Sequence, residues 1–82
     1  MDLNDTPIGD SALMYLASLP HLKALQLEDT RITDNGLVHL KAMRKLRSLN
    51  VTGTKITAEG AASLRREIPG IALWDSSGRL VD

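Results

Sequence analysis

The sequence predicts an α/β fold, a short right-handed solenoid of about three repeats with a parallel concave sheet and convex helices. Two observations predict it. The segment LQLEDTRITDNGL at 25–37 returns 24 residues later as LNVTGTKITAEGA, with leucine, threonine and isoleucine in the same slots. Apolar residues spaced by three then follow in each copy, as on one helix face. Because one such unit cannot bury its apolar face alone, neighbouring units must cover one another.

Short parallel strands are expected near Leu3 and at 25–28, 49–52 and 71–74. The spacing between corresponding strand residues is 24, 24 and then 22, which aligns Ile71 with Leu49. Alternation along each strand sends odd-numbered residues into the core and even-numbered residues to the concave face. A column of threonines is expected to hydrogen-bond the backbone in the loops after the strands: Thr6, Thr30 and Thr54.

Helices are expected near 10–18, 34–44 and 58–67. Thr33 and Thr57 precede the last two as N-caps, because a hydroxyl can accept a hydrogen bond from a free backbone N–H. A small residue beside each apolar helix face is expected to let the helix approach the sheet closely: Ala12, Gly36 and Gly60. We expect one domain, 1–82, with units at 1–24, 25–48 and 49–70 and a C-terminal cap at 71–82.

Composition excludes several classes of protein. The 82 residues carry no net charge, whereas a general binder of nucleic acid or acidic membrane needs a basic excess. The apolar runs are too short for a membrane span, and the acidic N-terminus does not resemble a signal peptide. We therefore expect a cytoplasmic location. A chain this small, without cysteine, is expected to gain stability by associating with a partner or with itself.

Two units resemble the leucine-rich repeat consensus L-x-x-L-x-L-x-x-N/C-x-L. The matching residues are Leu22, Leu25, Leu27, Thr30 and Ile32, then Leu46, Leu49, Val51, Thr54 and Ile56. The 24-residue unit is most similar to the ribonuclease-inhibitor-like and cysteine-containing subgroups, especially bacterial repeats with T-x-I-T-D-x-G-L. The resemblance covers almost the whole chain and implies an α/β horseshoe and, usually, a protein-binding role. Having only about three units departs from the family pattern and limits any enclosing concave surface.

Two surfaces are candidates for binding. The first is the concave face, polar and mildly acidic with one aromatic residue, although ordinary solvated sheet residues would look the same. Its candidate residues are Asn4, Gln26, Glu28, Asn50, Thr52 and Trp74, the last of which is also a candidate lid over the final strand. The second is the N-terminal edge, which no preceding helix covers. Its candidate residues, for an oligomer or another partner, are Leu3, Ile8, Leu13 and Leu16.

Three explanations of the N-terminal edge stay open. A second copy or another chain covers it, the sequence is a piece of a longer protein, or the first unit frays. Across both surfaces, the expected function is a non-enzymatic protein–protein interaction module. The alternatives are a small structural accessory subunit of a larger complex and the C-terminal repeat fragment of a longer protein. The expected partner is another protein or a second copy, not a nucleic acid or a small-molecule substrate.

Catalytic, cofactor and metal sites are not expected. His21 and His39 have no second ligand at helical spacing. The segment TGTK at 52–55 lacks the spacing of a phosphate-binding loop, and the repeat already accounts for it.

Overall fold

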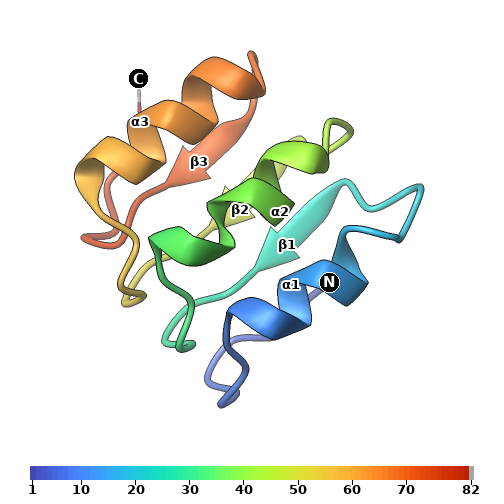
Figure 1. The fold of residues 1–82 in the computed structure, drawn as a ribbon. Helices are drawn as coiled ribbons and strands as arrows, with labels where there is room; N and C mark the ends of the chain where they lie inside the picture. Colours follow the sequence, from blue (N-terminus) through green and yellow to red (C-terminus); the bar gives the residue numbers. More distant parts are fainter. Residues whose placement is uncertain (82) are drawn as a thin grey trace.

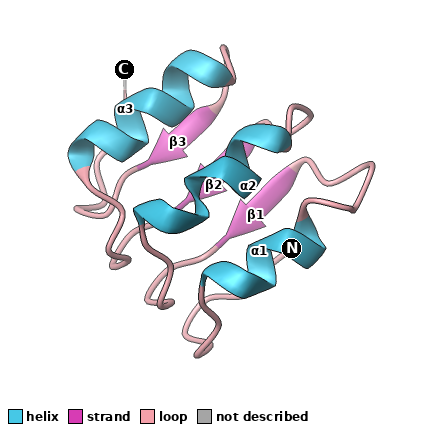
Figure 2. Ribbon diagram, viewed as in Figure 1, coloured by secondary structure: helices cyan, strands magenta, loops and turns pink. Residues whose placement is uncertain are grey.

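The computed structural model describes residues 1–81, in which strands and helices alternate (Figure 1). The helices are α1 (Asp10–Leu16), α2 (Leu37–Ala42), α3 (Ala58–Glu67) and a single 3-10 turn, η1 (Asp34–Gly36). The strands are β1 (Ala24–Gln26), β2 (Ser48–Asn50) and β3 (Ala72–Trp74). Figure 2 shows the three α-helices side by side on one face of the sheet, one helix opposite each strand. The predicted fold class, a short α/β solenoid, is therefore confirmed.

The strands form a parallel sheet in the order β1-β2-β3. Leu25 pairs with Leu49 and Leu49 with Leu73, so the 24-residue spacing holds across the whole sheet. The predicted contraction to 22 was therefore wrong. Ile71 lies one position before β3 and is buried there, and the Ala72 N–H donates to the Arg47 carbonyl at 2.8 Å, which fixes this register.

The backbone hydrogen bonds continue past the ends of the strands. The Leu27 N–H donates to the Asn50 carbonyl at 2.8 Å, and the Asp29 N–H donates to the Thr52 carbonyl at 2.9 Å. Asp29 then turns the chain with a left-handed φ of 57°. The strand expected near Leu3 is a single bridge between Asp2 and Gln26, so residues 1–5 lie along the free side of β1.

The helix boundaries follow their caps. The Thr33 hydroxyl accepts from the Asn35 N–H at 3.2 Å, and the Thr57 hydroxyl accepts from the Gly60 N–H at 3.1 Å, which confirms both predicted N-caps. The helix expected at 34–44 begins as η1 and ends early, at Ala42. It ends because Met43 leaves helical geometry and buries its side chain in the core.

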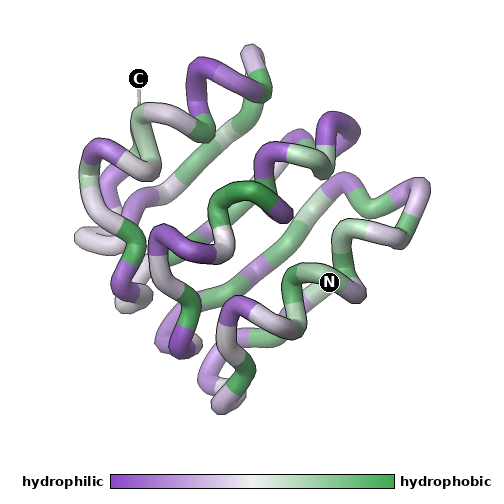
Figure 3. The backbone as a smooth tube through the Cα atoms, viewed as in Figure 1, coloured by the Kyte–Doolittle hydropathy of each residue, from purple (hydrophilic) through white to green (hydrophobic). Residues whose placement is uncertain are grey.

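The core is one layer of aliphatic side chains between helices and sheet, and the green segments of Figure 3 recur at corresponding places in each repeat. The threonine column closes the loops beside it, as predicted. The hydroxyls of Thr6, Thr30 and Thr54 each donate to the carbonyl three residues earlier, at 2.7, 2.9 and 2.7 Å. The core residues include Leu13, Leu25, Leu27, Ile32, Leu40, Leu46, Leu49, Val51, Ile56, Leu64 and Leu73.

The small residues of the helices serve a different contact from the one predicted. A Cβ added to Gly36 would lie 2.6 Å from both the Asp10 Oδ1 and the Leu13 Cδ1, and both atoms belong to the preceding repeat. A Cβ added to Gly60 would lie 2.6 Å from the Asp34 Oδ1 and 2.9 Å from the Leu37 Cδ1. Glycine is needed there because adjacent helices approach one another, not because a helix approaches the sheet.

Candidate functional site

The sheet face that is turned away from the helices, the concave face, carries side chains in rows across the strands. Even-numbered strand residues point to it and odd-numbered residues are buried, as the burial pattern of each strand shows. The first row holds the small residues Ala24, Ser48 and Ala72. The second row holds Asp2, Gln26, Asn50 and Trp74, and the third holds Asn4, Glu28 and Thr52.

Hydrogen bonds between neighbouring repeats hold the polar side chains of this face in place. The Asn4 Oδ1 accepts from the Glu28 N–H at 2.7 Å, and the Asn4 Nδ2 donates to the Gln26 Oε1 at 3.5 Å. The Asn50 Nδ2 donates to the Glu28 Oε1 at 2.7 Å, while its Oδ1 accepts from the Thr52 N–H and hydroxyl. Five of the six predicted concave residues thus belong to one hydrogen-bonded chain on the same surface.

Trp74, the sixth, lies in register with Asn50 at the C-terminal end of the second row and is half-buried. The edge of β3 is closed by the segment that follows it, not by the indole alone. Leu80 bridges antiparallel to Trp74, and the Val81 N–H donates to the Leu73 carbonyl at 2.7 Å. Trp74 therefore keeps part of its side-chain surface on the concave face.

Asp75 organises this C-terminal hairpin. Its Oδ1 accepts from the Ser77 hydroxyl at 2.7 Å, the Ser77 N–H at 3.0 Å and the Arg79 N–H at 3.0 Å. The Ser77 hydroxyl lowers the pKa of the Asp75 carboxyl more than burial raises it, and the backbone N–H groups of Arg79 and Ser77 and the charge of Arg79 lower it further. The hairpin is thus tied to an ionised carboxylate.

The N-terminal edge differs from the prediction at one residue. Leu13 is fully buried within the chain's own core, because its side chain points between α1 and the neighbouring repeat, so it is not part of an exposed edge. Leu3, Ile8 and Leu16 pack against the core but keep part of their surface exposed, whereas the matching Leu27, Ile32 and Leu40 are 0% exposed. The first repeat therefore lacks the cover that it gives to the second.

Several features escaped the sequence analysis. The convex face exposes Met14 and Val38, which occupy the same slot of adjacent repeats. The repeated Asp10 and Asp34 bind the next repeat, and a period search on aspartate followed 23 residues later by threonine would have found them. The Arg44–Glu67 pair, at 3.3 Å, is solvent-exposed and contributes little to stability.

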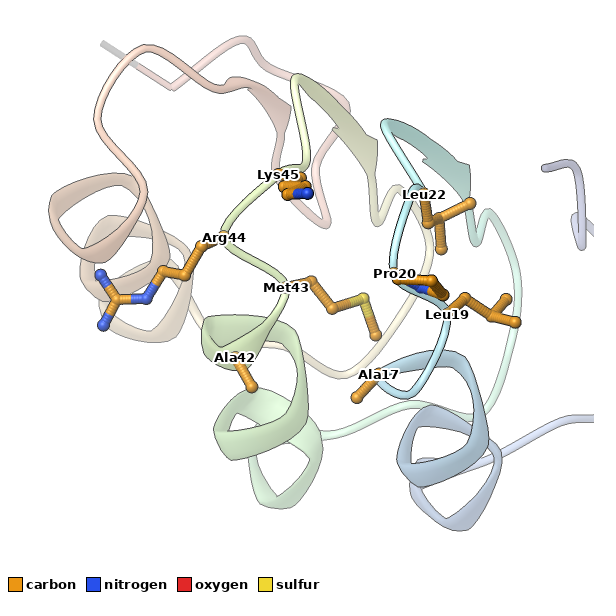
Figure 4. A pocket seen from close by; sticks show the side chains of 8 residues that line it. All are labelled: Ala17, Leu19, Pro20, Leu22, Ala42, Met43, Arg44 and Lys45. Carbon is orange, nitrogen blue, oxygen red and sulfur yellow. The ribbon is translucent and has the colours of Figure 1, made fainter.

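A pocket of about 210 Å³ opens between the two returns that lead into β1 and β2 (Figure 4). Met43 points into it, while the Arg44 guanidinium points away and bonds to the Glu67 carbonyl at 3.1 Å. Most of the lining is aliphatic, and it includes no carboxylate, hydroxyl, thiol or imidazole that could act in catalysis. The lining residues are Ala17, Leu19, Pro20, Leu22, Ala42, Met43, Arg44 and Lys45.

Within residues 1–81, no group of three or more histidine and acidic side chains gathers closely enough to hold a metal ion. In the same part of the chain, none of the helices has the length and apolar character needed to cross a membrane.

The comparisons with known proteins agree with this geometry. A family model described as Leucine Rich repeat matches residues 18–41 and 42–64, which together make up more than half of the chain. The chain belongs to the leucine-rich repeat family. No curated protein and no solved structure matches it. Domains of leucine-rich repeats are typically non-enzymatic and generally mediate protein–protein interactions, so the surface to look for on this leucine-rich repeat chain is one that a protein can cover.

Proposed function

We propose that this chain is a non-enzymatic protein–protein interaction module that binds its partner through the concave face. The observation that carries the proposal is the row of Gln26, Asn50 and Trp74 across three paired strands, with hydrogen-bonded polar side chains beside it. A rigid sheet presents these groups at fixed positions, so little conformational entropy is lost when a partner binds. Trp74 supplies the large, partly exposed aromatic surface that is enriched at the centre of protein interfaces.

The partner's contact surface is proposed to be basic. The concave rows include the acidic residues Asp2 and Glu28 and no lysine or arginine. The Glu28 Oε1 is held by Asn50, and the same carboxylate is half-buried beside the polar row. A lysine or arginine on the partner would complement this charge and speed association, an effect that salt would weaken.

The test is capture of binding proteins from the native cell extract by purified wild-type chain and by two concave-face variants. Trp74→Ala removes the aromatic surface, and Gln26→Lys places a positive charge on an exposed position of the same row. We expect both variants to lose the partner, by about 30-fold in affinity for the tryptophan change if Trp74 is a hot spot. Circular dichroism of each variant checks that the sheet and helices remain folded.

The control is Val38→Ala, which removes an exposed apolar side chain from the convex face. It should retain the partner at wild-type affinity. Retention of the same partner by both concave-face variants, with loss in Val38→Ala, would overturn the proposal and direct attention to the convex face. For a partner that is captured, Glu28→Gln should lower affinity about two- to fivefold at low salt and less at high salt.

The proposal also covers the subgroup of leucine-rich repeats to which the chain belongs. The 24-residue register, the threonine column and the T-x-I-T-D-x-G-L segment support placement among ribonuclease-inhibitor-like bacterial repeats. The second candidate function, a structural subunit held in a larger complex, is favoured by the partly exposed Leu3, Ile8 and Leu16 at the N-terminal edge.

A further inference from the structure

Three kinds of contact join each repeat to the one before it, and each recurs at both interfaces. The first is a backbone hydrogen bond in the loop after the strand. The Arg31 N–H donates to the Ile8 carbonyl at 2.8 Å, and the Lys55 N–H donates to the Ile32 carbonyl at 2.9 Å. A residue with an amide hydrogen is therefore required at this slot wherever a repeat precedes it.

The second contact is a pair of hydrogen bonds to an aspartate of the preceding repeat. The N–H and hydroxyl of Thr33 both donate to the Asp10 carboxylate, the N–H at 2.8 Å. The N–H and hydroxyl of Thr57 donate to the Asp34 carboxylate at 2.9 and 2.7 Å. The C-terminal repeat of each pair thus needs a hydroxyl at the slot of Thr33 and Thr57. The repeat before it needs a carboxylate at the slot of Asp10 and Asp34, which is the next slot of the 24-residue unit.

The third contact is the close approach at Gly36 and Gly60, described above, where no Cβ fits unless the aspartate and leucine side chains of the preceding repeat shift. The aspartate that a Cβ would displace is the same one that binds the threonine. The second and third contacts are therefore coupled: moving the carboxylate to make room would weaken its two hydrogen bonds.

The first repeat lacks all three features. At the three slots, 24 residues before Arg31, Thr33 and Gly36, it carries Pro7, Gly9 and Ala12. Proline has no amide hydrogen, glycine has no hydroxyl, and alanine has the Cβ that the close approach excludes. From this we infer that the N-terminal face is a capping face of the solenoid. A further repeat of this type does not stack on it in the register that the other repeats share.

One more observation fits this inference. At the opposite end of the array, Ala58 stands where Asp10 and Asp34 stand, and the hairpin through Leu80 covers β3. Head-to-tail stacking of two copies is thus disfavoured at both faces, and any protein that contacts Leu3, Ile8 and Leu16 must do so by other means.

The test adds a repeat to the intact chain. A copy of residues 25–48 placed before Met1 continues the register, because position 1 corresponds to 25 and 49. One version keeps the natural face. The other carries Pro7→Arg, Gly9→Thr and Ala12→Gly, which are the residues of the second repeat at the same slots. The dependence of the unfolding free energy on urea concentration, the m-value, scales with the surface buried on folding and reports whether the added repeat stacks.

On the natural face we expect the m-value of the unextended chain and rapid amide hydrogen exchange throughout the added repeat. On the substituted face we expect the m-value to rise by about 30%, in proportion to the added residues, with protected amides in the added strand. A full rise on the natural face would overturn the inference. So would failure of the added repeat to stack on the substituted face while the unextended triple variant remains folded, because the three residues would then not be the reason.

Discussion

At the scale of the residue, Asp34 shows how one side chain joins two repeats. It begins η1, where a negative charge suits the helix N-terminus, and it also accepts two hydrogen bonds from Thr57 of the next repeat. Thr57 in turn caps α3 by accepting from Gly60. The first turn of one helix and the cap of the next are therefore held by the same carboxylate.

Replacing Asp34 with alanine should lower the free energy of unfolding by about 1 kcal/mol, because Thr57 loses two partners while its cap is loosened. Urea denaturation measures this loss. The matched control is Glu59→Ala, which removes an exposed acidic residue from the first turn of α3 and should cost at most about 0.5 kcal/mol through the helix dipole. Equal losses in the two variants would mean that the dipole, and not the bond to Thr57, accounts for the effect of Asp34.

At the scale of the element, the C-terminal hairpin is closed by few contacts and one carboxylate. The Asp75 side chain accepts its three hydrogen bonds through a single oxygen, and the hairpin's return covers the outer edge of β3. Because the pKa of Asp75 is lower in the folded chain than its ordinary value, the ionised form stabilises the closed hairpin.

The hairpin should therefore loosen at acid pH. The stabilisation is complete well above the ordinary pKa of 3.8 and is lost as the pH falls through the lower, folded-state value. NMR should show the amide signals of Ser77, Arg79 and Val81 changing together as the pH is lowered from about 5 to about 2. Asp75→Asn keeps one acceptor oxygen but cannot titrate, so these signals should no longer share a transition. The same transition in that variant would assign it to another group.

At the scale of the whole molecule, the burial of a core side chain depends on the neighbouring repeats. The same leucine slot holds Leu16, Leu40 and Leu64, and the last two are 0% exposed while Leu16 is only partly buried. The three residues have the same type and the same place in their repeats, and they differ only in whether a repeat lies before them. The stability lost when this leucine is replaced in each repeat therefore measures how much one repeat stabilises the next.

Alanine at Leu40 or at Leu64 should cost about 2–5 kcal/mol, which is enough to unfold much of a chain this small, and alanine at Leu16 should cost about half as much. Urea unfolding followed by circular dichroism and by Trp74 fluorescence gives the three values and tests whether the repeats unfold together. A loss at Leu16 as large as that at Leu64 would contradict this account, since it would mean that the N-terminal side is covered after all.

Most of the fold could be predicted from the sequence because its period is repeated. Apolar slots, threonine loops and both N-caps were correct, since each depends on local chemistry that recurs every 24 residues. The register of β3 was not, because Ile68 and Ile71 imitate a consensus spacing while the backbone hydrogen bonds align Leu73 with Leu49. The reason for Gly36 and Gly60 was also missed, because a close approach between helices leaves no sign in the spacing alone.

The candidate site was predicted in part. Alternation placed the concave residues on one surface, but it gave no hint that Asn4 and Asn50 would join them by hydrogen bonds. The edge residues were chosen as core slots without cover, and Leu13 was wrong because a helix residue can point toward the following repeat as well as toward the preceding one.

The Asp–Thr contact also has a direction, since the carboxylate always reaches from a repeat to its C-terminal neighbour. Only the middle repeat carries both halves of it, with Thr33 to receive and Asp34 to give. Internal gene duplication of those 24 residues would create a compatible junction at every step, whereas duplication of an outer repeat would bring Gly9 or Ala58 into the interior. This protein can therefore be lengthened, in evolution or in the laboratory, by duplication of its middle repeat.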